Sequence, residues 1–378
     1  MSTGRKVMAW ERALGWEKSR SPAKGIVPVK GLVLTESGDY GENYSYVTES
    51  KKRGYPVFFY DPNPGIEHLF LPYYYKMRGG KATDDCLVNS HRQLSSAATA
   101  GVFDGMINTS WDDSGLHNQC WMPRFVCAAE FSWKAAGRDV ETWARRYFAS
   151  YHGPEARDLR ELFQLLQDGA LFYYDTFQRR VWHWGDVGKV HLPDLPRGGL
   201  EYDGFWRRRY AGLLQRARSE RQRIARAMAI LDDNLSRDVR RRYDLEVMRT
   251  CAELMRHNVD LVLMLGDLEE DVATASAHHF SDRREALSRL QSAARRIEEH
   301  LADRQQVFEQ LLGVWERTRL PKGLSLPDKP FVHARDRARH FANRTPDMSY
   351  LVLDEQLLGL EAYLADLKEF IRRYPEQD

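Results

Sequence analysis

The stretch VFDGMINTSWDDSG, residues 102–115, decides our interpretation of the fold. Its first nine residues predict a short buried strand, which leads into Trp111, Asp113 and a glycine-containing loop. In barrels of parallel strands, the chemistry takes place at the carboxyl ends of the strands. An indole ring beside a carboxylate suits a sugar, because sugar C–H faces stack on indole while hydroxyl groups donate to the carboxylate.

Length and composition are those of a globular protein. The chain has 378 residues, of which 43% are hydrophobic, and this is enough for two domains and a sizeable core. The formal net charge is +2 and charges of both signs are interspersed, so composition favours neither nucleic acid nor a membrane surface as a partner. No run of 18 or more apolar residues is present, so no membrane span is predicted.

The first 150 residues alternate apolar strands with helical stretches, which is the pattern of βα units in a parallel sheet. Four strands are half of the number that an eight-stranded barrel needs. We therefore predict an α/β domain over residues 1–150 that is a partial (β/α)8, or TIM, barrel. Strands are predicted over residues 6–10, 31–36, 56–60 and 105–111, and helices over residues 84–100 and 121–135.

The second half of the chain has a helical pattern. Residues 151–204, rich in aromatic residues, Gly and Pro towards their end, are predicted to connect the two halves. Apolar residues at three- and four-residue steps then indicate helices that bury one face. An all-α, antiparallel helical bundle is therefore predicted over residues 205–378. The clearest stripe consists of Leu353, Leu357, Leu360, Leu364, Leu367 and Ile371.

The stretch from Gly105 to Trp133 resembles the last barrel strand and following helix of glycoside hydrolase family 20, the β-N-acetylhexosaminidases. In that family the eighth strand ends in a Trp with an acidic residue two positions later, and Trp111 and Asp113 have this spacing. The stretch KVMAWERAL, residues 6–14, resembles the end of the fifth strand. The resemblance covers roughly residues 5–150 and implies the C-terminal half of the barrel.

This resemblance implies a pocket for one terminal N-acetylhexosamine. Trp10 and Trp111 would form its walls, and Asp113 would accept hydrogen bonds from hydroxyl groups of the ring. Tyr60 would donate to the acetamido oxygen, and Asp61 would be a further sugar ligand. These two residues are adjacent here but two positions apart in the family, so only one of them can face the pocket, because neighbours on a strand point to opposite sides.

The same residues have simpler structural interpretations. Trp111 would then belong to a hydrophobic core, and Asp113 would cap a helix. Residues 61–64, Asp-Pro-Asn-Pro, would form a tight turn.

The catalytic pair of the family is not found in this chain. Its members are substrate-assisted retaining enzymes, in which an Asp orients the acetamido oxygen and an adjacent Glu protonates the leaving oxygen. That pair ends the fourth strand, upstream of the region of resemblance. The chain has one Asp-Glu dipeptide, Asp354-Glu355, and its position at the start of the last helix predicts a solvated helix face.

No metal ion or organic cofactor is predicted. His278 and His279 have no third ligand at a suitable spacing and are interpreted as a surface pair. The four cysteines show no CxxC spacing and are predicted to be buried free thiols.

The main functional hypothesis is a β-N-acetylhexosaminidase-like glycosidase, or a C-terminal fragment of one, whose catalytic pair lies in a missing N-terminal half-barrel. The alternative is a non-catalytic carbohydrate-binding or structural protein that associates through its helices. Half a barrel has open sheet edges, so this alternative predicts a dimer. The first residues lack the apolar stretch of a secretory signal, which predicts a cytoplasmic protein if Met1 is the true start and leaves the location unknown otherwise.

Overall fold

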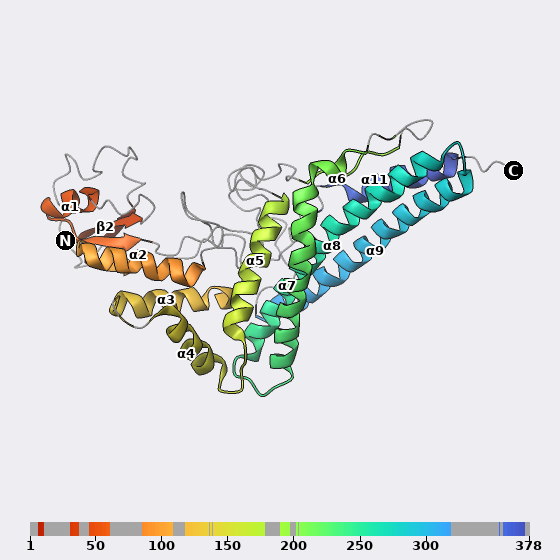
Figure 1. Cartoon of the computed structure of the whole chain (residues 1–378). Helices are drawn as coiled ribbons and strands as arrows, with labels where there is room; N and C mark the ends of the chain where they lie inside the picture. Colours follow the sequence, from red (N-terminus) through yellow and green to blue (C-terminus); the bar gives the residue numbers. More distant parts are fainter. Residues whose placement is uncertain are drawn as a thin grey trace, which may run out of the picture. The chain divides into compact units, whose positions relative to one another are not determined.

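The protein is mainly helical (Figure 1). Among the residues that the structure describes, helices make up much of the amino-terminal part and nearly all of the carboxyl-terminal part. The computed structural model describes residues 7–10, 31–37, 45–60, 85–108, 118–135, 137, 139–177, 190–196, 202, 204–318, 355 and 358–374.

A small parallel sheet lies in the amino-terminal part. Its strand order is β1-β2-β3-β4, which is also the order along the chain. The pairs Trp10–Thr35, Ser37–Tyr60 and Tyr60–Ile107 fix the register. The strands are β1 (Val7–Trp10), β2 (Leu32–Ser37), β3 (Val57–Tyr60) and β4 (Gly105–Ile107).

The core of this sheet is small. Leu34 of β2 and Val57 of β3 are buried together with Val47 of helix α1 (Ser45–Lys52) and with Tyr55. Burying each of these side chains contributes roughly 1.5–3 kcal/mol. The sheet therefore depends on a few residues from its two central strands and one helix.

The predicted partial TIM barrel is wrong. The described residues are mainly helical and contain one small parallel sheet of four short strands, and after β4 they form only helices. These are the 3-10 helix η3 (Asn118–Cys120), α3 (Met122–Trp133), α4 (Val140–His152) and α5 (Leu159–Phe177). Strands did form at the four predicted places, so local periodicity was interpreted correctly and its extension to a barrel was not.

Helices α2 (Cys86–Ala100) and α3 pack against each other. The Asp85 carboxylate caps α2 by accepting hydrogen bonds from the backbone N–H groups of Leu87 and Val88, at 2.8 and 3.2 Å. Phe131 of α3 is buried and contacts the ring of His91 edge-on, with 4.2 Å between ring centroids. All four cysteines are buried and free, as predicted.

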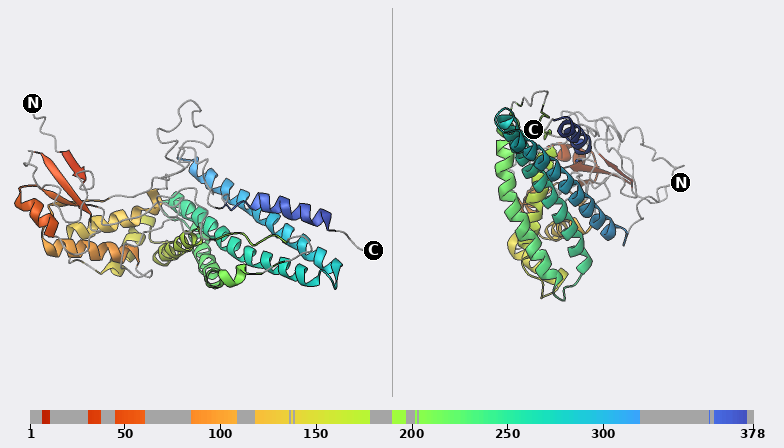
Figure 2. Two further views of the ribbon diagram at one scale, coloured as in Figure 1. Left: turned by 90° about the horizontal axis from the view of Figure 1, so that it is seen from above. Right: turned by 90° about the vertical axis from the view of Figure 1, so that its right-hand side faces the viewer.

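The carboxyl-terminal helices pack around α8 (Figure 2). This helix contacts α5, α7 and α9, and α9 also contacts α11. At Gly169 of α5 a Cβ atom would lie 2.7 Å from the Met255 sulfur, so glycine permits the close approach of α5 to α8. The helices are α6 (Trp206–Arg209), α7 (Ala211–Leu235), α8 (Arg242–His278), α9 (Arg283–Trp315) and α11 (Leu360–Arg373).

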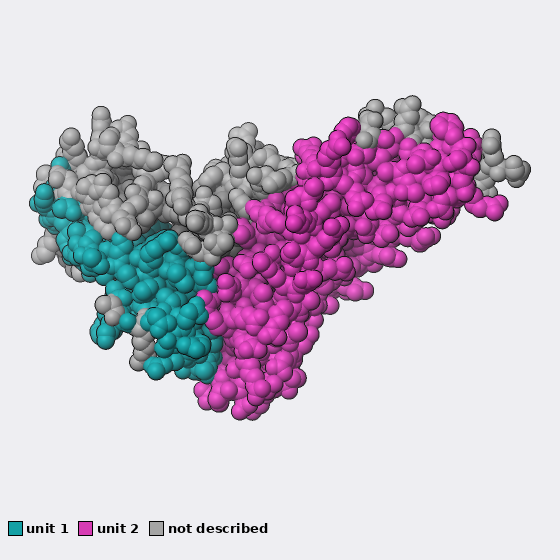
Figure 3. All heavy atoms as spheres, viewed as in Figure 1, with its two compact units in different colours: residues 1–66, 74–112, 118–151 teal, residues 67–73, 113–117, 152–378 magenta. Residues whose placement is uncertain are grey.

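The chain divides into two compact units, shown in teal and magenta in Figure 3. The first contains the sheet with α1, α2, α3 and α4 up to Tyr151, and the second contains residues 67–73 and 113–117 together with His152 and the helices α5 to α9 and α11. Helix α5 occupies part of the stretch that was predicted to be a connecting segment. None of the described helices is long and apolar enough to cross a membrane.

His152 belongs to the second unit and is almost completely buried. Its carbonyl accepts a 2.7 Å hydrogen bond from the backbone N–H of Arg240, and its Nδ1 lies 3.4 Å from the Arg240 carbonyl. Burial lowers the pKa of His152 to about 4; the hydrogen bond to Arg240 opposes this shift and the charge of Arg241 adds to it. The ring is therefore held neutral in the folded protein.

We expect His152 to make stability fall with acidity. Between pH 6.5 and 4, His152 binds a proton in the unfolded chain but not in the folded chain. The free energy of unfolding therefore decreases as pH falls, by up to roughly 3 kcal/mol. Urea unfolding of the wild type and of His152→Asn across this pH range measures the effect. In the variant, the free energy of unfolding should depend less on pH over this range. If it depends on pH as strongly in the variant as in the wild type, His152 is not the group responsible.

Candidate functional site

The predicted sugar pocket is described only in part. Trp10 ends β1 and Tyr60 ends β3, so both lie at the carboxyl edge of the parallel sheet, with β2 between them. The Tyr60 side chain is half-buried. The Trp10 side chain, and the whole of Asp61, Trp111 and Asp113, lie outside the described residues.

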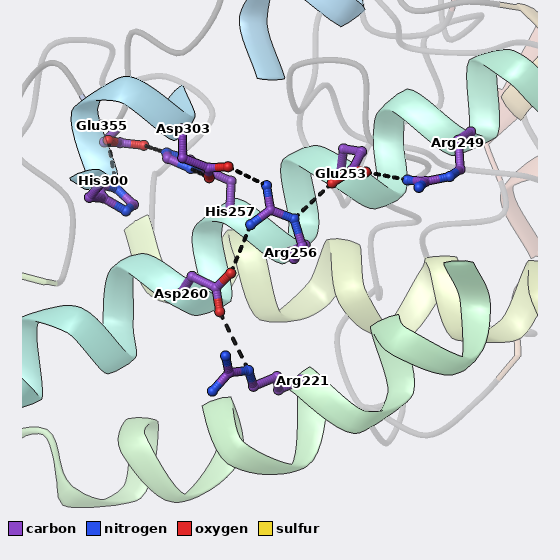
Figure 4. Close-up of polar contacts among 9 residues, drawn as sticks. All are labelled: Arg221, Arg249, Glu253, Arg256, His257, Asp260, His300, Asp303 and Glu355. Carbon is purple, nitrogen blue, oxygen red and sulfur yellow. Dashed lines mark hydrogen bonds and ion pairs between the residues drawn. The ribbon is translucent and has the colours of Figure 1, made fainter. Parts of the chain in front are cut away.

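The second unit contains a polar cluster formed by His257, His300 and Glu355, which are buried, and by Asp303, which is partly exposed (Figure 4). His257 of α8 lies between two carboxylates: its Nδ1 is 2.6 Å from Asp303 Oδ2, and its Nε2 is 2.6 Å from Glu355 Oε2. His300 of α9 places its Nε2 3.0 Å from Glu355 Oε1. The two imidazole rings are stacked, with centroids 4.1 Å apart.

Charge explains why this cluster is tolerated inside the protein. Burial alone would lower the pKa of His257, but the charge of Glu355 and the hydrogen bonds to Asp303 and Glu355 raise it to about 9. Burial alone would raise the pKa of Glu355, but the charge of His257 and the hydrogen bonds from both histidines lower it to about 2. His257 is therefore an imidazolium that neutralises a buried carboxylate.

An ion-pair network joins the cluster to the surface. Arg256, next to His257, donates to Asp303 at 2.7 Å, to Asp260 at 2.9 Å and to Glu253 at 2.7 Å. Asp260 in turn lies 3.6 Å from the Arg221 guanidinium of α7 (Figure 4). The hydrogen bonds from His257 and Arg256 outweigh burial and lower the pKa of Asp303 below its ordinary value.

The prediction that Glu355 belongs to a solvated helix face is wrong. Glu355 is only 4% exposed and is bonded to two histidines. The signal that could have found its partners is a pair of histidines within apolar helical stripes: His257 is flanked by Leu254 and Leu261, and His300 follows Ile297 by three residues. The site itself could not be derived from sequence, because its three segments are far apart in the chain.

The cluster has two chemical properties that matter for function. Among the described residues, His257, His300 and Glu355 offer one metal-ligating atom each, and these atoms lie within 4.8 Å of one another. In contrast, Glu355 is unsuited to general-acid catalysis, because its lowered pKa keeps it ionised at neutral pH. The cluster therefore does not replace the missing catalytic pair of a hexosaminidase.

No protein-family model and no curated protein matches this sequence. Among solved structures, the chain is similar to a GH138 enzyme targeting pectin rhamnogalacturonan II, a glycoside hydrolase. The two share 12% sequence identity with a TM-score of 0.45, and the match covers 91% of this chain and 43% of that chain. This chain thus spans less than half the length of its distant structural neighbour, and a likeness at this level carries no conclusion about fold or activity.

We expect Glu355→Gln to destabilise the protein by about 3–5 kcal/mol, because it leaves the His257 imidazolium buried without its second carboxylate. Urea unfolding at pH 7 measures the loss. Glu361→Gln is the matched control: this exposed carboxylate pairs with Arg304, which also lies 3.6 Å from Glu355. The control should change stability by less than about 1 kcal/mol, and equal effects of the two variants would contradict the role of Glu355.

Proposed function

We propose that the first unit binds carbohydrate with a terminal N-acetylhexosamine, as part of a β-N-acetylhexosaminidase-like glycosidase. One observation supports this proposal above the others: the strands that end in Trp10 and Tyr60 are parallel and share a carboxyl edge. In open parallel sheets, ligands bind beyond this edge. An aromatic wall and a phenol donor at the same edge of a sheet are groups that would bind an N-acetylated sugar.

The chain following β4 would complete the pocket. Tyr60 pairs with Ile107, so β3 and β4 end side by side. Trp111 and Asp113 follow four and six residues later. Trp111 would stack on the ring face, and Asp113 would accept hydrogen bonds from ring hydroxyls; with Tyr60 facing the pocket, Asp61 would point to the other side.

The proposed reaction needs residues that this chain does not provide. In a substrate-assisted mechanism the acetamido oxygen attacks the anomeric carbon while a carboxylic acid protonates the leaving oxygen. The single Asp-Glu dipeptide includes Glu355, which is buried in the second unit and held ionised by two histidines. A further polypeptide segment would have to supply the acid.

We expect the purified chain to bind N-acetylglucosamine without hydrolysing an aryl N-acetyl-β-glucosaminide. A chromogenic assay and calorimetry measure the two properties separately. Turnover that is lost in Trp111→Ala would contradict the absence of an acid, and absence of sugar binding would remove the proposal.

We expect Trp10→Ala to weaken sugar binding by about 0.5–1.5 kcal/mol through loss of aromatic stacking, and Asp113→Asn by about 1–3 kcal/mol through loss of a charge-assisted hydrogen bond. Trp133→Ala is the control, since this indole at the end of α3 is 92% exposed. Calorimetric titration measures each affinity. An effect of Trp133→Ala as large as that of Trp10→Ala would show that the loss is unspecific.

The second candidate is a non-catalytic protein that associates with a partner. Within the described part of the chain, β1 and β4 are the outer strands of the sheet, and each has one edge that pairs with no described strand. Such edges favour pairing with another chain. A dimer in sedimentation experiments, combined with absence of sugar binding, would favour this candidate.

A further inference from the structure

We propose that His257, His300 and Glu355 form a binding site for a divalent transition metal of the zinc class. This site lies in the second unit and is independent of the carbohydrate site proposed for the first. Its ligands come from α8, from α9 and from the residue at position 355.

The ligand set is the first argument. Two imidazole nitrogens and one carboxylate oxygen are ligands that zinc accepts in proteins, whereas Mg²⁺ and Ca²⁺ favour sites made of oxygen alone. All three side chains are at most 6% exposed. Their ligand atoms lie within 4.8 Å of one another, so small side-chain rotations bring them around one ion.

The surroundings of His257 are the second argument. A histidine that binds a metal through one ring nitrogen usually donates its other N–H to a carboxylate or carbonyl, which fixes the tautomer and makes the ring a better ligand. His257 directs Nε2 to the shared centre and Nδ1 to Asp303 at 2.6 Å. Arg256 fixes Asp303 in turn through a 2.7 Å hydrogen bond.

Metal binding would exchange an ion for a proton. In the present arrangement a proton lies between His257 Nε2 and Glu355 Oε2, which are 2.6 Å apart. On binding, this proton leaves to solvent and His300 exchanges its Nε2 proton for one on Nδ1, so that both rings ligate through Nε2 as neutral imidazoles while Glu355 stays a carboxylate. The two rings are now nearly parallel, at 16°, so one must tilt for both lone pairs to meet the ion.

His300 is the ring that would tilt. His257 is held at both of its ring nitrogens by carboxylates, whereas the hydrogen bond of the His300 ring to Glu355 is one that the metal itself replaces. The ion would then join α8, α9 and position 355 in the interior, so its role would be structural.

The test is metal binding by the untagged full chain. The protein is stripped with a chelator, dialysed against Zn²⁺, and analysed for bound zinc by elemental mass spectrometry. We expect about one zinc per chain and a higher unfolding temperature, and a loss of at least tenfold in affinity in His300→Gln and in Glu355→Gln. His279→Gln is the control and should bind zinc as the wild type does, since His279 lies near Tyr374, away from the cluster.

A second measurement covers variants that fail to fold. Co²⁺ added to the stripped wild type should give visible ligand-field bands typical of nitrogen ligation, and Asp303→Asn should bind it 10- to 100-fold more weakly. The proposal is overturned if the wild type binds no zinc and shows no such bands. Zinc binding that survives in folded His300→Gln and Glu355→Gln, or a preference for Mg²⁺ over Zn²⁺, would overturn it equally. Loss of sugar binding in the first unit would not affect it.

Discussion

The protonated ring of His257, held between Asp303 and Glu355, is the interaction on which the helical unit depends. A buried carboxylate is tolerated only when it is paired and hydrogen-bonded. Glu355 meets this requirement through two histidines from different helices. Arg256 in turn holds Asp303. Directional hydrogen bonds therefore join α8, α9 and position 355, in addition to their hydrophobic packing. A buried polar group of this kind selects one arrangement of helices among several that bury similar apolar area.

The two units offer different chemistry. In the first, the ends of β1 and β3 lie at the same carboxyl edge of a parallel sheet with β2 between them, and the ligand we propose there is a sugar. In the second, two imidazole nitrogens and a carboxylate oxygen lie within 4.8 Å of one another in the interior. The carboxylate of Glu355 stays ionised because of its histidine partners, which suits a metal ligand and not a general acid. The sugar and metal proposals therefore involve separate residues and can fail separately.

Much of the local structure could be predicted from periodicity, and the fold class could not. Four apolar runs predicted β1 to β4 to within a few residues, because the spacing of apolar residues along a short segment indicates which of its side chains are buried. The partial barrel was wrong because four parallel strands fit both a piece of a barrel and a small open sheet. The structure decides against the barrel, because the described residues are mainly helical and the sheet is limited to four short strands. Helices α4 and α5 were not predicted from the sequence.

The sequence by itself determined where the four strands and the helices α2 and α3 form, the mixed charge of the chain and the burial of the cysteines, because each follows from neighbouring residues or from composition. It also placed Trp10 and Tyr60 at strand ends. Only the tertiary structure decided that the protein is mainly helical and that Glu355 lies inside it. The physical reason is distance along the chain: His257, His300 and Glu355 belong to segments separated by 43 and 55 residues, as their numbers show. Which of them meet depends on how α8 and α9 pack, and no local pattern encodes that packing.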